Sequence, residues 1–355
     1  MKKCFLPFLF IITFASSVAL YGESRAPIRD GDLSIHFLEL GNRYTGDCVY
    51  INYGEMDLLI DAGSKQTSAI IIKNYIDGYM VDKKIEYVIA THAHEDHISG
   101  FASTAAAAGI LESYEIGTII DFPKTNSNSR TYSRYLQARS KAVENGAIHF
   151  TALECYNNEG AAQRVFQLGE NVKLEILYNY FYENSTREEN DYSVCVKIIN
   201  NENQYLFTGD LEKEGEDLLV DYYETNYGGL GHCMLYKGGH HGSNSSSSEK
   251  LMAAITPEYV CVCSCVGSAQ YRAGPKNIFP SQGFVDRVAP YTDKVYITTL
   301  VEDYSGNNYL PFNGNIVFLV SDNKVTILCS ENDTKLKDTE WFKNNRQMPQ
   351  AWSGK

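Results

Sequence analysis

The sequence lacks the motifs that mark several common classes of enzyme. It contains no G-x-S-x-G turn of a serine hydrolase, no phosphate-binding loop of the Walker type, and no G-x-G-x-x-G dinucleotide pattern. It also lacks the C-x-x-C spacing that is typical of structural metal clusters. No reaction centre of these kinds therefore competes with the motifs described below.

Basic residues are scarce relative to acidic ones. The chain has 31 Lys and Arg against 44 Asp and Glu, which gives a formal net charge of −13. A surface that binds nucleic acid tightly is normally basic, because contacts to phosphates dominate such affinity. The composition therefore disfavours duplex DNA as a ligand. A local basic rim could still guide an anion, although a solvated helix face is the simpler interpretation; its residues are Lys124, Arg130, Arg134, Arg139 and Lys141.

The N-terminus is apolar over too short a length for a confident membrane span. Lys2 and Lys3 precede the apolar run Phe5–Phe14, and Ser17-Val18-Ala19 offers a small-x-small cleavage signal. This pattern predicts a secretory signal peptide over residues 1–22, and hence a secreted, extracellular or periplasmic protein. An uncleaved anchor is the alternative. The remaining chain is long enough for one full core, so we expect a single domain over 23–334 and a polar tail over 335–355.

Eight cysteines follow the predicted cleavage point, an even number that permits disulfides in an oxidising compartment. Cys261, Cys263 and Cys265 alternate along one expected strand, so they share a face and cannot easily pair with each other. Buried thiols that pack as small apolar groups are the favoured interpretation.

The most informative segment is T-H-A-H-E-D-H-I-S-G over 91–100. It places His92, His94, Asp96 and His97 within six residues, directly after the apolar, strand-like run 85–90. Histidines at i and i+2 of an extended loop point the same way, whereas Asp96 and His97 must serve a second direction. Imidazoles and carboxylates are ligands for divalent cations such as zinc, and this arrangement suits two cations better than one.

Two further motifs follow in the order that such a site needs. Tyr205–Asp210 is an apolar strand that ends in T-G-D, where a carboxylate could bridge two cations. Leu235–Ser248 contains K-G-G-H-H-G-S-N-S-S-S-S, with His240 and His241 at the end of another apolar stretch. The flanking glycines allow backbone conformations with positive φ that can aim a ring inward.

Taken together, these motifs resemble the metallo-β-lactamase superfamily of metal-dependent hydrolases. Within it, the chain is most similar to the hydrolase domain of the DNA-uptake protein ComEC and its free-standing relatives. The fold implied by this resemblance is an αββα sandwich of two mixed sheets with outer helices and a site along one edge. The matching segments lie between Leu33 and Leu328 and include Ile35–Gly41, Gly46–Asp47, Leu58–Gly63, the histidine loop, Asn190–Val194, the T-G-D turn and the H-H-G-S segment.

The resemblance implies a role for each motif residue. His92 and His94 would bind one metal and Asp96 and His97 the other, with Asp210 between them. One of His240 and His241 would complete the second site, and we favour His240 because it directly follows the expected strand and glycine turn. Asp61 would orient the metal loop without being a ligand. The implied cofactor is two divalent metal ions, zinc first, with manganese or iron as alternatives.

Two positions depart from the superfamily pattern. Many relatives carry one more histidine before the T-G-D segment, but Leu177–Tyr182 contains none, and ComEC-like members often lack it too. His149 is the remaining histidine between the metal loop and Asp210; a packed or solvated role suits it better than a ligand role. Phe279 stands where ComEC-like chains usually have a histidine before proline.

A site of this kind would activate water against an electrophilic centre. Two metals stabilise the attacking and leaving oxygens of a phosphodiester together, with Asp96 and Asp210 as proton acceptors. We therefore expect a metal-dependent hydrolase for a small-molecule or polymeric phosphodiester, with nucleic acid disfavoured by charge and no stable protein partner. Secreted phosphorylcholine esterases share the fold. The alternatives are a lactone, thioester or β-lactam hydrolase and a metal-bearing binding protein without catalysis.

Three residues beside the metal histidines are candidates for substrate binding. Lys237, Ser243 and Asn244 could bind phosphate oxygens, although the same loop could simply cap the helix that follows Ser248. Elsewhere, the alanine-rich segment Gly100–Leu111 and the segment Asn126–Glu144 are expected to form helices. Two apolar runs between Lys294 and Ser330 are expected to complete the second sheet.

Overall fold

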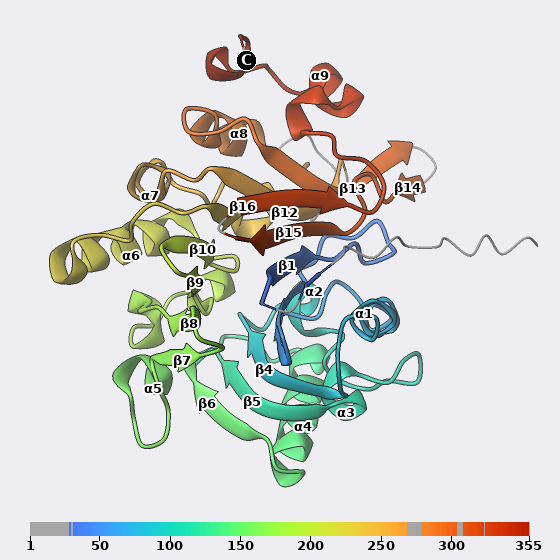
Figure 1. Cartoon of the computed structure of the whole chain (residues 1–355), viewed down its shortest axis with the longest axis vertical. Coiled ribbons are helices and arrows are strands. Elements are labelled where there is room, and N and C mark those ends of the chain that lie inside the picture. The colour runs from blue at the N-terminus through green and yellow to red at the C-terminus, as the bar shows by residue number, and fades with distance from the viewer. Residues whose placement is uncertain (1–27, 30, 268–277, 304–307, 323, 355) are drawn as a thin grey trace, which may run out of the picture.

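A computed structural model describes residues 28–354 except 30, 268–277, 304–307 and 323. Within this part, two mixed sheets face each other (Figure 1). The first sheet has the spatial order β16 (Lys324–Cys329), β15 (Ile316–Ser321), β1 (Leu33–Phe37), β2 (Val49–Tyr53), β3 (Met56–Ile60), β4 (Lys84–Ala90), β5 (Glu115–Asp121) and β6 (Ile148–Thr151). The second has the order β14 (Asn308–Leu310), β13 (Val295–Asp303), β12 (Tyr259–Val266), β11 (Leu235–Lys237), β10 (Asn203–Phe207), β9 (Val196–Asn200), β8 (Val172–Ile176) and β7 (Val165–Gln167).

Helices lie outside the two sheets (Figure 1). One apolar core lies between the sheets, where the rings of Phe37 and Phe207 stack across the interface at 6.3 Å. A second core lies between the second sheet and its helices and includes Leu206, Tyr236 and Leu219. The helices are α1 (Ser68–Ile76), α2 (Glu95–Ile98), α3 (Ile110–Ser113), α4 (Arg130–Glu144), α5 (Ala152–Asn157), α6 (Lys213–Tyr227), α7 (Glu249–Ile255), α8 (Gln282–Val288) and α9 (Glu340–Asn345). This architecture confirms the predicted αββα sandwich.

Both sheets contain a parallel block whose strands end at the same edge of the sandwich. Strands β3 to β6 run parallel in the first sheet, and β10 to β13 run parallel in the second. The near-continuous apolar sequences of β4 and β12 suit strands that are covered on both faces. The loops that follow β4, β10 and β11 therefore meet at one edge, which is where ligands bind in parallel sheets.

Two expectations about single elements are wrong. Gly100–Leu111 is not a helix: the chain turns through it and becomes helical only at α3. The hydroxyl of Thr104 accepts from the backbone N–H of Ala106, and that of Ser103 accepts from Gly109, so local side-chain bonds replace helical ones. The apolar run in β15 joins the first sheet, because it pairs antiparallel with β1 (Phe318 opposite Ile35), whereas β13 does join the second.

The segment Asn126–Glu144 is helical from Arg130, as α4. The Ser129 side chain accepts from the backbone N–H of Tyr132, which explains where the helix begins. Tyr135 is fully buried and donates to Asp121, so it belongs to the core.

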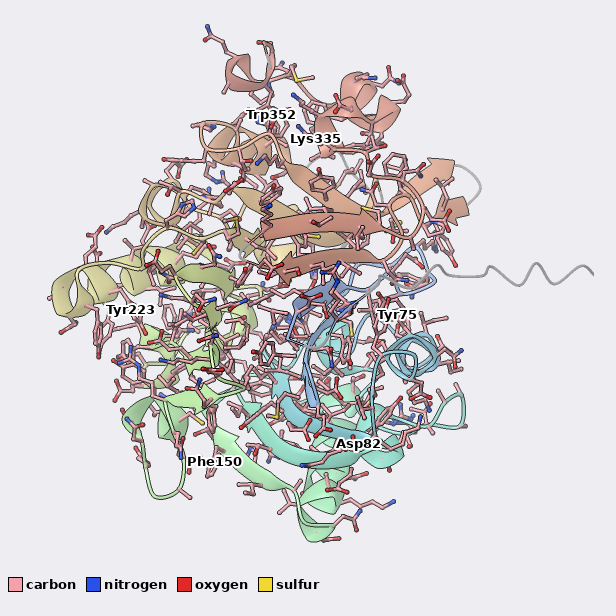
Figure 2. All side chains as sticks on the ribbon, in the orientation of Figure 1. Tyr75, Asp82, Phe150, Tyr223, Lys335 and Trp352 are labelled. Carbon is pink, nitrogen blue, oxygen red and sulfur yellow. The ribbon has the colours of Figure 1, made fainter. Side chains whose placement is uncertain are left out.

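The polar C-terminal segment packs against the second core. Trp341, Phe342 and Trp352 are buried there, and the Trp352 indole donates to the carbonyl of Thr292 at 2.8 Å. Figure 2 labels Lys335 and Trp352, which lie in this segment. The predicted signal peptide, residues 1–22, lies outside the described residues. Among those described, no helix is both long and apolar enough to cross a membrane. All eight cysteines after the predicted cleavage point are free thiols, and seven of them are buried.

Candidate metal centre

The candidate centre is assembled from four loops at the shared edge of the two sheets. The histidine loop follows β4 and leads into α2, and the T-G-D turn follows β10. The two adjacent histidines form the 3-10 turn η3 (Gly239–Gly242) after β11. The fourth loop precedes β2 and contributes Asp47, a residue to which the motif pattern assigns no role.

Asp61 anchors the histidine loop from below. Its side chain accepts from the backbone N–H of Thr91 at 2.8 Å and from the Thr91 hydroxyl at 2.7 Å. It also lies 2.7 Å from Nδ1 of His97, which leaves Nε2 of that ring to face the centre. Asp61 is 1% exposed and has a positive φ of 61°, a conformation that is rare outside glycine and occurs at functional sites. These contacts are those that an orienting, non-ligating aspartate requires.

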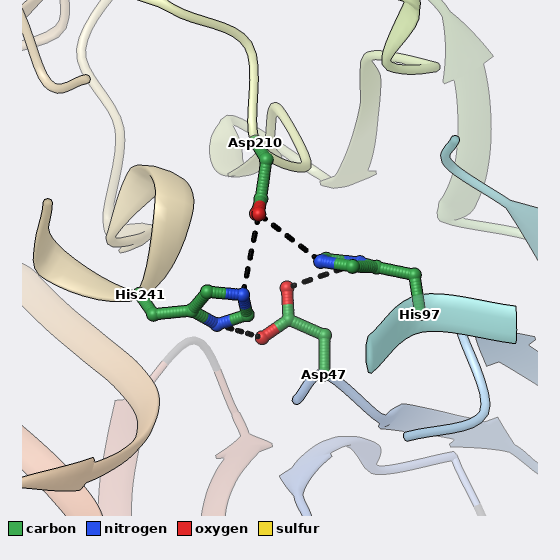
Figure 3. A group of neighbouring side chains, drawn as sticks. All are labelled: Asp47, His97, Asp210 and His241. Carbon is green, nitrogen blue, oxygen red and sulfur yellow. Dashed lines mark hydrogen bonds and ion pairs between the residues drawn. The ribbon is translucent and has the colours of Figure 1, made fainter. Parts of the chain in front are cut away.

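Asp210 is the point at which the second group of ligand residues converges (Figure 3). Its Oδ2 lies 3.1 Å from Nε2 of His97 and 3.2 Å from Nε2 of His241. Nε2 of His241 also lies 3.5 Å from Oδ2 of Asp96. Separations of about 3 Å between donor atoms are those of ligands around one small cation, since bonds to zinc are about 2.0–2.2 Å long.

The structure favours His241 over His240 in this group, which corrects the preference stated from sequence. Nε2 of His240 is 3.8 Å from Asp210, and its Nδ1 lies 3.0 Å from the hydroxyl of Ser245. Both histidines adopt left-handed backbone conformations, with φ of 44° and 53°. This tight turn, rather than the order of the two residues after the strand, decides that the second ring points between Asp210 and Asp96.

Asp47 supports the centre from the opposite side of the same two rings (Figure 3). Its Oδ1 lies 3.1 Å from Nδ1 of His241, its Oδ2 lies 3.8 Å from Nδ1 of His97, and it forms an ion pair with Lys237. The four residues Asp47, His97, Asp210 and His241 offer ligand atoms within 4.8 Å of one another. Because the Nε2 atoms face Asp210, while Lys237 already neutralises Asp47, we assign Asp47 an orienting role.

The first group consists of His92 and His94. Nε2 of His92 lies 3.0 Å from Nδ1 of His94, so the two rings present a pair of nitrogens to one point. The rings of His92 and His97 are 4.1 Å apart, which places the two groups side by side. His149 is not part of either group: it lies on β6, where Nε2 is 2.8 Å from Asp121 and 3.2 Å from Arg139.

The donor set fits a divalent cation. Nε2 of His241 and Oδ1 of Asp210 are buried atoms without a hydrogen-bond partner among the described residues. Burial lowers the pKa of His97, but the carboxylates of Asp210 and Asp61 outweigh it and raise that pKa well above its usual value. Burial raises the pKa of Asp210, but His241 and His97 outweigh it and lower that pKa well below its usual value. The buried carboxylates of this site need compensating positive charge. A bound divalent cation supplies it without protonation of the histidines.

The residues predicted to bind substrate are placed differently from one another. Lys237 is only 2% exposed and its ammonium group is held by Asp47, so the structure assigns it to charge balance behind the centre and not to the substrate surface. The Ser243 side chain is buried and contacts Ser245, whereas Asn244 is exposed. The hydroxyl of Ser248 accepts from the backbone N–H of Leu251, so the end of this loop does cap α7.

A pair of buried charged residues that sequence reasoning missed fixes the serine-rich loop. Glu216 accepts from the backbone N–H groups of Ser247 and Ser248 at 2.8 and 2.6 Å. Arg287 donates to the carbonyls of Ser246 and Ser247 at 2.8 and 2.6 Å. Both come from helices, α6 and α8, in which nothing in the local sequence distinguishes them from surface charges.

Comparison with known proteins finds relatives over part of the chain. The chain is 28% identical over 198 residues to the competence protein ComA of Neisseria gonorrhoeae, covering 55% of this chain and 27% of that protein. It is 24% identical over 209 residues to recombination protein 2 of Haemophilus influenzae, covering 58% of this chain and 21% of that one. The chain therefore spans about a quarter of the length of these relatives. Among solved structures, it resembles the metallo-β-lactamase fold protein YhfI of Bacillus subtilis with a TM-score of 0.43 and 11% identity, covering 76% of this chain and 96% of that one.

The two facing sheets and the aspartate–histidine centre at their edge define a protein of the metallo-β-lactamase superfamily, as predicted, and the similarity to ComA supports the competence-type resemblance. The family profile described as anti-Pycsar protein Apyc1 matches residues 40–247, which include every motif of the centre. The chain belongs to this family.

Proposed function

We propose that this protein is a metal-dependent phosphodiesterase. The observation that carries the proposal is the position of Asp210 between two adjacent groups of ligand residues. The Nε2 atoms of His97 and His241 both approach its Oδ2, Asp96 lies beside His241, and the His92–His94 pair lies beside His97. Two neighbouring cation positions suit phosphodiester hydrolysis, in which the attacking and the leaving oxygen both carry negative charge.

Divalent cations bound there would lower the pKa of water toward neutrality and polarise the phosphoryl oxygens. The protein's own groups would then direct the reaction. Asp96 and Asp210 accept the proton of the attacking water, because their carboxylates face the interior of the centre. Asp61 and Asp47 hold Nδ1 of His97 and His241, so that both rings keep Nε2 toward the reacting groups.

The acidic composition guides the choice of substrate. With a net charge of −13, the protein suits a small or zwitterionic phosphodiester better than a long polyanion. A choline phosphodiester is one such compound. We further propose two zinc ions as the cofactor and secretion as the route, with no stable protein partner.

The test is hydrolysis of bis-p-nitrophenyl phosphate by the purified chain without residues 1–22, supplied in parallel with zinc, manganese or iron. A His94→Ala, Asp210→Ala double variant should lose turnover by at least about 10³-fold, since it removes a ligand from each group. His232→Ala is the matched control, because that exposed histidine lies near Thr256, away from the centre. A protein that holds two metals yet leaves this diester intact contradicts the proposal. Hydrolysis of a lactone, thioester or β-lactam instead would identify the alternative reaction.

A further inference from the structure

The first cation position has fewer evident protein ligands than the second. His92 and His94 offer two nitrogens, and the nearby ring of His97 is directed by Asp61 toward Asp210 in the second group. Leu177–Tyr182, the segment before T-G-D without a histidine, contains Asn179, but the amide of Asn179 donates to the carbonyls of Asp191 and Ser193 at 2.7 and 3.0 Å, and its oxygen accepts from the backbone N–H of Phe181. The first position therefore has room for a further ligand besides these two nitrogens.

Asn190 is a buried amide with one half of its side chain unused. The residue lies in the 3-10 turn η2 (Glu189–Tyr192) and is 6% exposed. Its Nδ2 donates to Oε1 of Glu212 at 3.3 Å, which fixes the orientation of the amide. Its Oδ1 is buried without a hydrogen-bond partner in the part of the chain that the structure describes. A buried carbonyl oxygen without a partner costs about 1–3 kcal/mol, so its place in the folded protein favours a bound group at this atom.

Two residues close to Asn190 in the sequence, Glu189 and Ser193, contact the histidine loop directly. Glu189 lies 3.3 Å from the backbone N–H of Ala93, the residue between His92 and His94. On the other side, the hydroxyl of Ser193 is 3.5 Å from Nδ1 of His92 and accepts from the backbone N–H of Asp210 at 3.1 Å. Asn190 is therefore enclosed between the His92–His94 pair and the segment that carries Asp210 and Glu212.

We propose that Oδ1 of Asn190 is the third protein ligand of the cation held by His92 and His94. This inference rests on the proposed two-cation function. A neutral amide oxygen is a good ligand for divalent cations and a harder one than imidazole. The first position would then have two nitrogens, the amide oxygen and Asp210, whereas the second has two nitrogens and two carboxylates. The first position should bind its cation more weakly and be filled second.

The structural arrangement explains how an asparagine can serve here. Glu212 holds Nδ2, so the oxygen cannot rotate away, in the way that outer carboxylates fix metal-binding histidines. Glu189 is itself held by the Thr125 hydroxyl at 2.7 Å and by the backbone N–H of Asn126 at 2.6 Å, which fixes the turn on which Asn190 lies. The position thus has the same two features as the candidate ligands His97 and His241: a donor atom that can face a cation and a neighbour that orients the side chain.

The experiment measures bound metal and not turnover. The full chain, stripped with a chelator and titrated with zinc, should bind two ions in two steps by calorimetry and elemental mass spectrometry. In Asn190→Ala the weaker step should weaken by at least roughly tenfold while the stronger one is unchanged. Asn190→His should strengthen the weaker step and shift the visible absorption bands of the cobalt(II) form, because a nitrogen replaces an oxygen. Asn52→Ala is the control, as Asn52 is a buried asparagine on β2 with partners of its own.

Three results would contradict the assignment of Asn190 as a metal ligand, and a fourth would separate it from the proposed reaction. Two unchanged binding steps in Asn190→Ala overturn the inference, and so does a loss of the weaker step in His240→Gln but not in Asn190→Ala. If Asn190→Ala does not fold, an unchanged cobalt spectrum in Asn190→His overturns it instead. A wild-type protein that binds two ions through Asn190 but leaves bis-p-nitrophenyl phosphate intact would contradict the proposed reaction and leave this ligand assignment standing.

Discussion

At the scale of single residues, the centre depends on charges that are buried in pairs. Asp47 and Lys237 are 1% and 2% exposed and form an ion pair behind His241. Breaking a buried ion pair by removing one partner typically costs 3–5 kcal/mol, and here Lys237 would keep only the more distant carboxylate of Asp210, at 3.9 Å. We therefore expect Asp47→Asn to lower the free energy of unfolding by roughly 3 kcal/mol in urea denaturation with a chelator present.

The double variant Asp47→Asn, Lys237→Met is the control for that prediction. It removes both charges, so it should regain most of the stability that the single variant loses. Equal losses in the single and double variants would mean that the two charges are not coupled.

The burial of His36, away from the metal centre, predicts that the free energy of unfolding depends on pH. Burial lowers its pKa to about 3, and its ring contacts Ser34 and Tyr75, which are uncharged. Below pH 6.5 the unfolded chain takes up a proton that the folded protein cannot, so stability falls as pH decreases. His36→Phe should remove from this slope about 0.7 kcal/mol per pH unit at pH 6.5, rising toward about 1.4 kcal/mol per pH unit at pH 5, measured by urea unfolding. The variant also starts less stable by about 1–3 kcal/mol, since Tyr75 and Ser34 lose a partner. An unchanged slope would assign the acid sensitivity to other groups.

The residue types at the centre were predictable from sequence, whereas their precise roles were not. The loop with His92 and His97 is specific because few other functions require such spacing. His240 and His241 are adjacent in a tight turn, and only the backbone conformation decides which ring enters the centre. The sequence does contain an indication of a role for Asp47, because Thr45-Gly46-Asp47 has the same three residues as Thr208-Gly209-Asp210. Lys237 looked available for substrate because sequence does not reveal burial.

At the scale of elements, one carboxylate connects three segments around the centre. Glu189 accepts from Ala93 in the histidine loop and from Thr125 and Asn126 in the loop between β5 and α4. In Glu189→Gln the amide NH2 must face one of these donors, so at least one bond is lost. We expect the free energy of unfolding to fall by about 1–3 kcal/mol and backbone hydrogen exchange to quicken over 122–129. Glu188→Gln, one residue earlier and exposed, should change neither. Unaltered exchange in Glu189→Gln would mean that the loop is held by other contacts.

Elements were predictable where apolar pattern and capping agreed. Strand β4 and helix α4 combine a clear pattern with a clear boundary, and both form as expected. Gly100–Leu111 shows the limit of composition: alanine favours helix, but Ser103 and Thr104 bond to the local backbone instead. The sequence around β15 does not indicate which sheet the strand joins, because its partner β1 lies near the other end of the chain.

At the scale of the whole molecule, cation binding should be coupled to folding. The ligands come from loops of both sheets and converge only in the folded state, so a cation binds the native form selectively. Zinc at 100 times its dissociation constant should stabilise the protein by about 2.7 kcal/mol, seen as a higher Tm than in excess chelator. The Asp210→Ala variant should show little of this shift. An equal shift in both would mean that zinc binds elsewhere.

The overall negative charge of the protein predicts how kcat/KM depends on ionic strength. The acidic surface should repel an anionic substrate, and the basic residues near α4 offer little compensation: Arg139 pairs with Asp121, Lys141 lies 3.8 Å from Glu112, and Lys124 donates to the carbonyl of Glu183. Salt screens such repulsion, with a Debye length of about 10 Å at 0.1 M. Raising the ionic strength from about 10 to 150 mM should therefore increase kcat/KM for anionic bis-p-nitrophenyl phosphate several-fold. The zwitterionic p-nitrophenyl phosphorylcholine has no net charge to repel, so its kcat/KM should change by less than about twofold. If salt instead lowers kcat/KM for the anion, a local positive field steers substrate to the centre, and long polyanions return as candidate substrates.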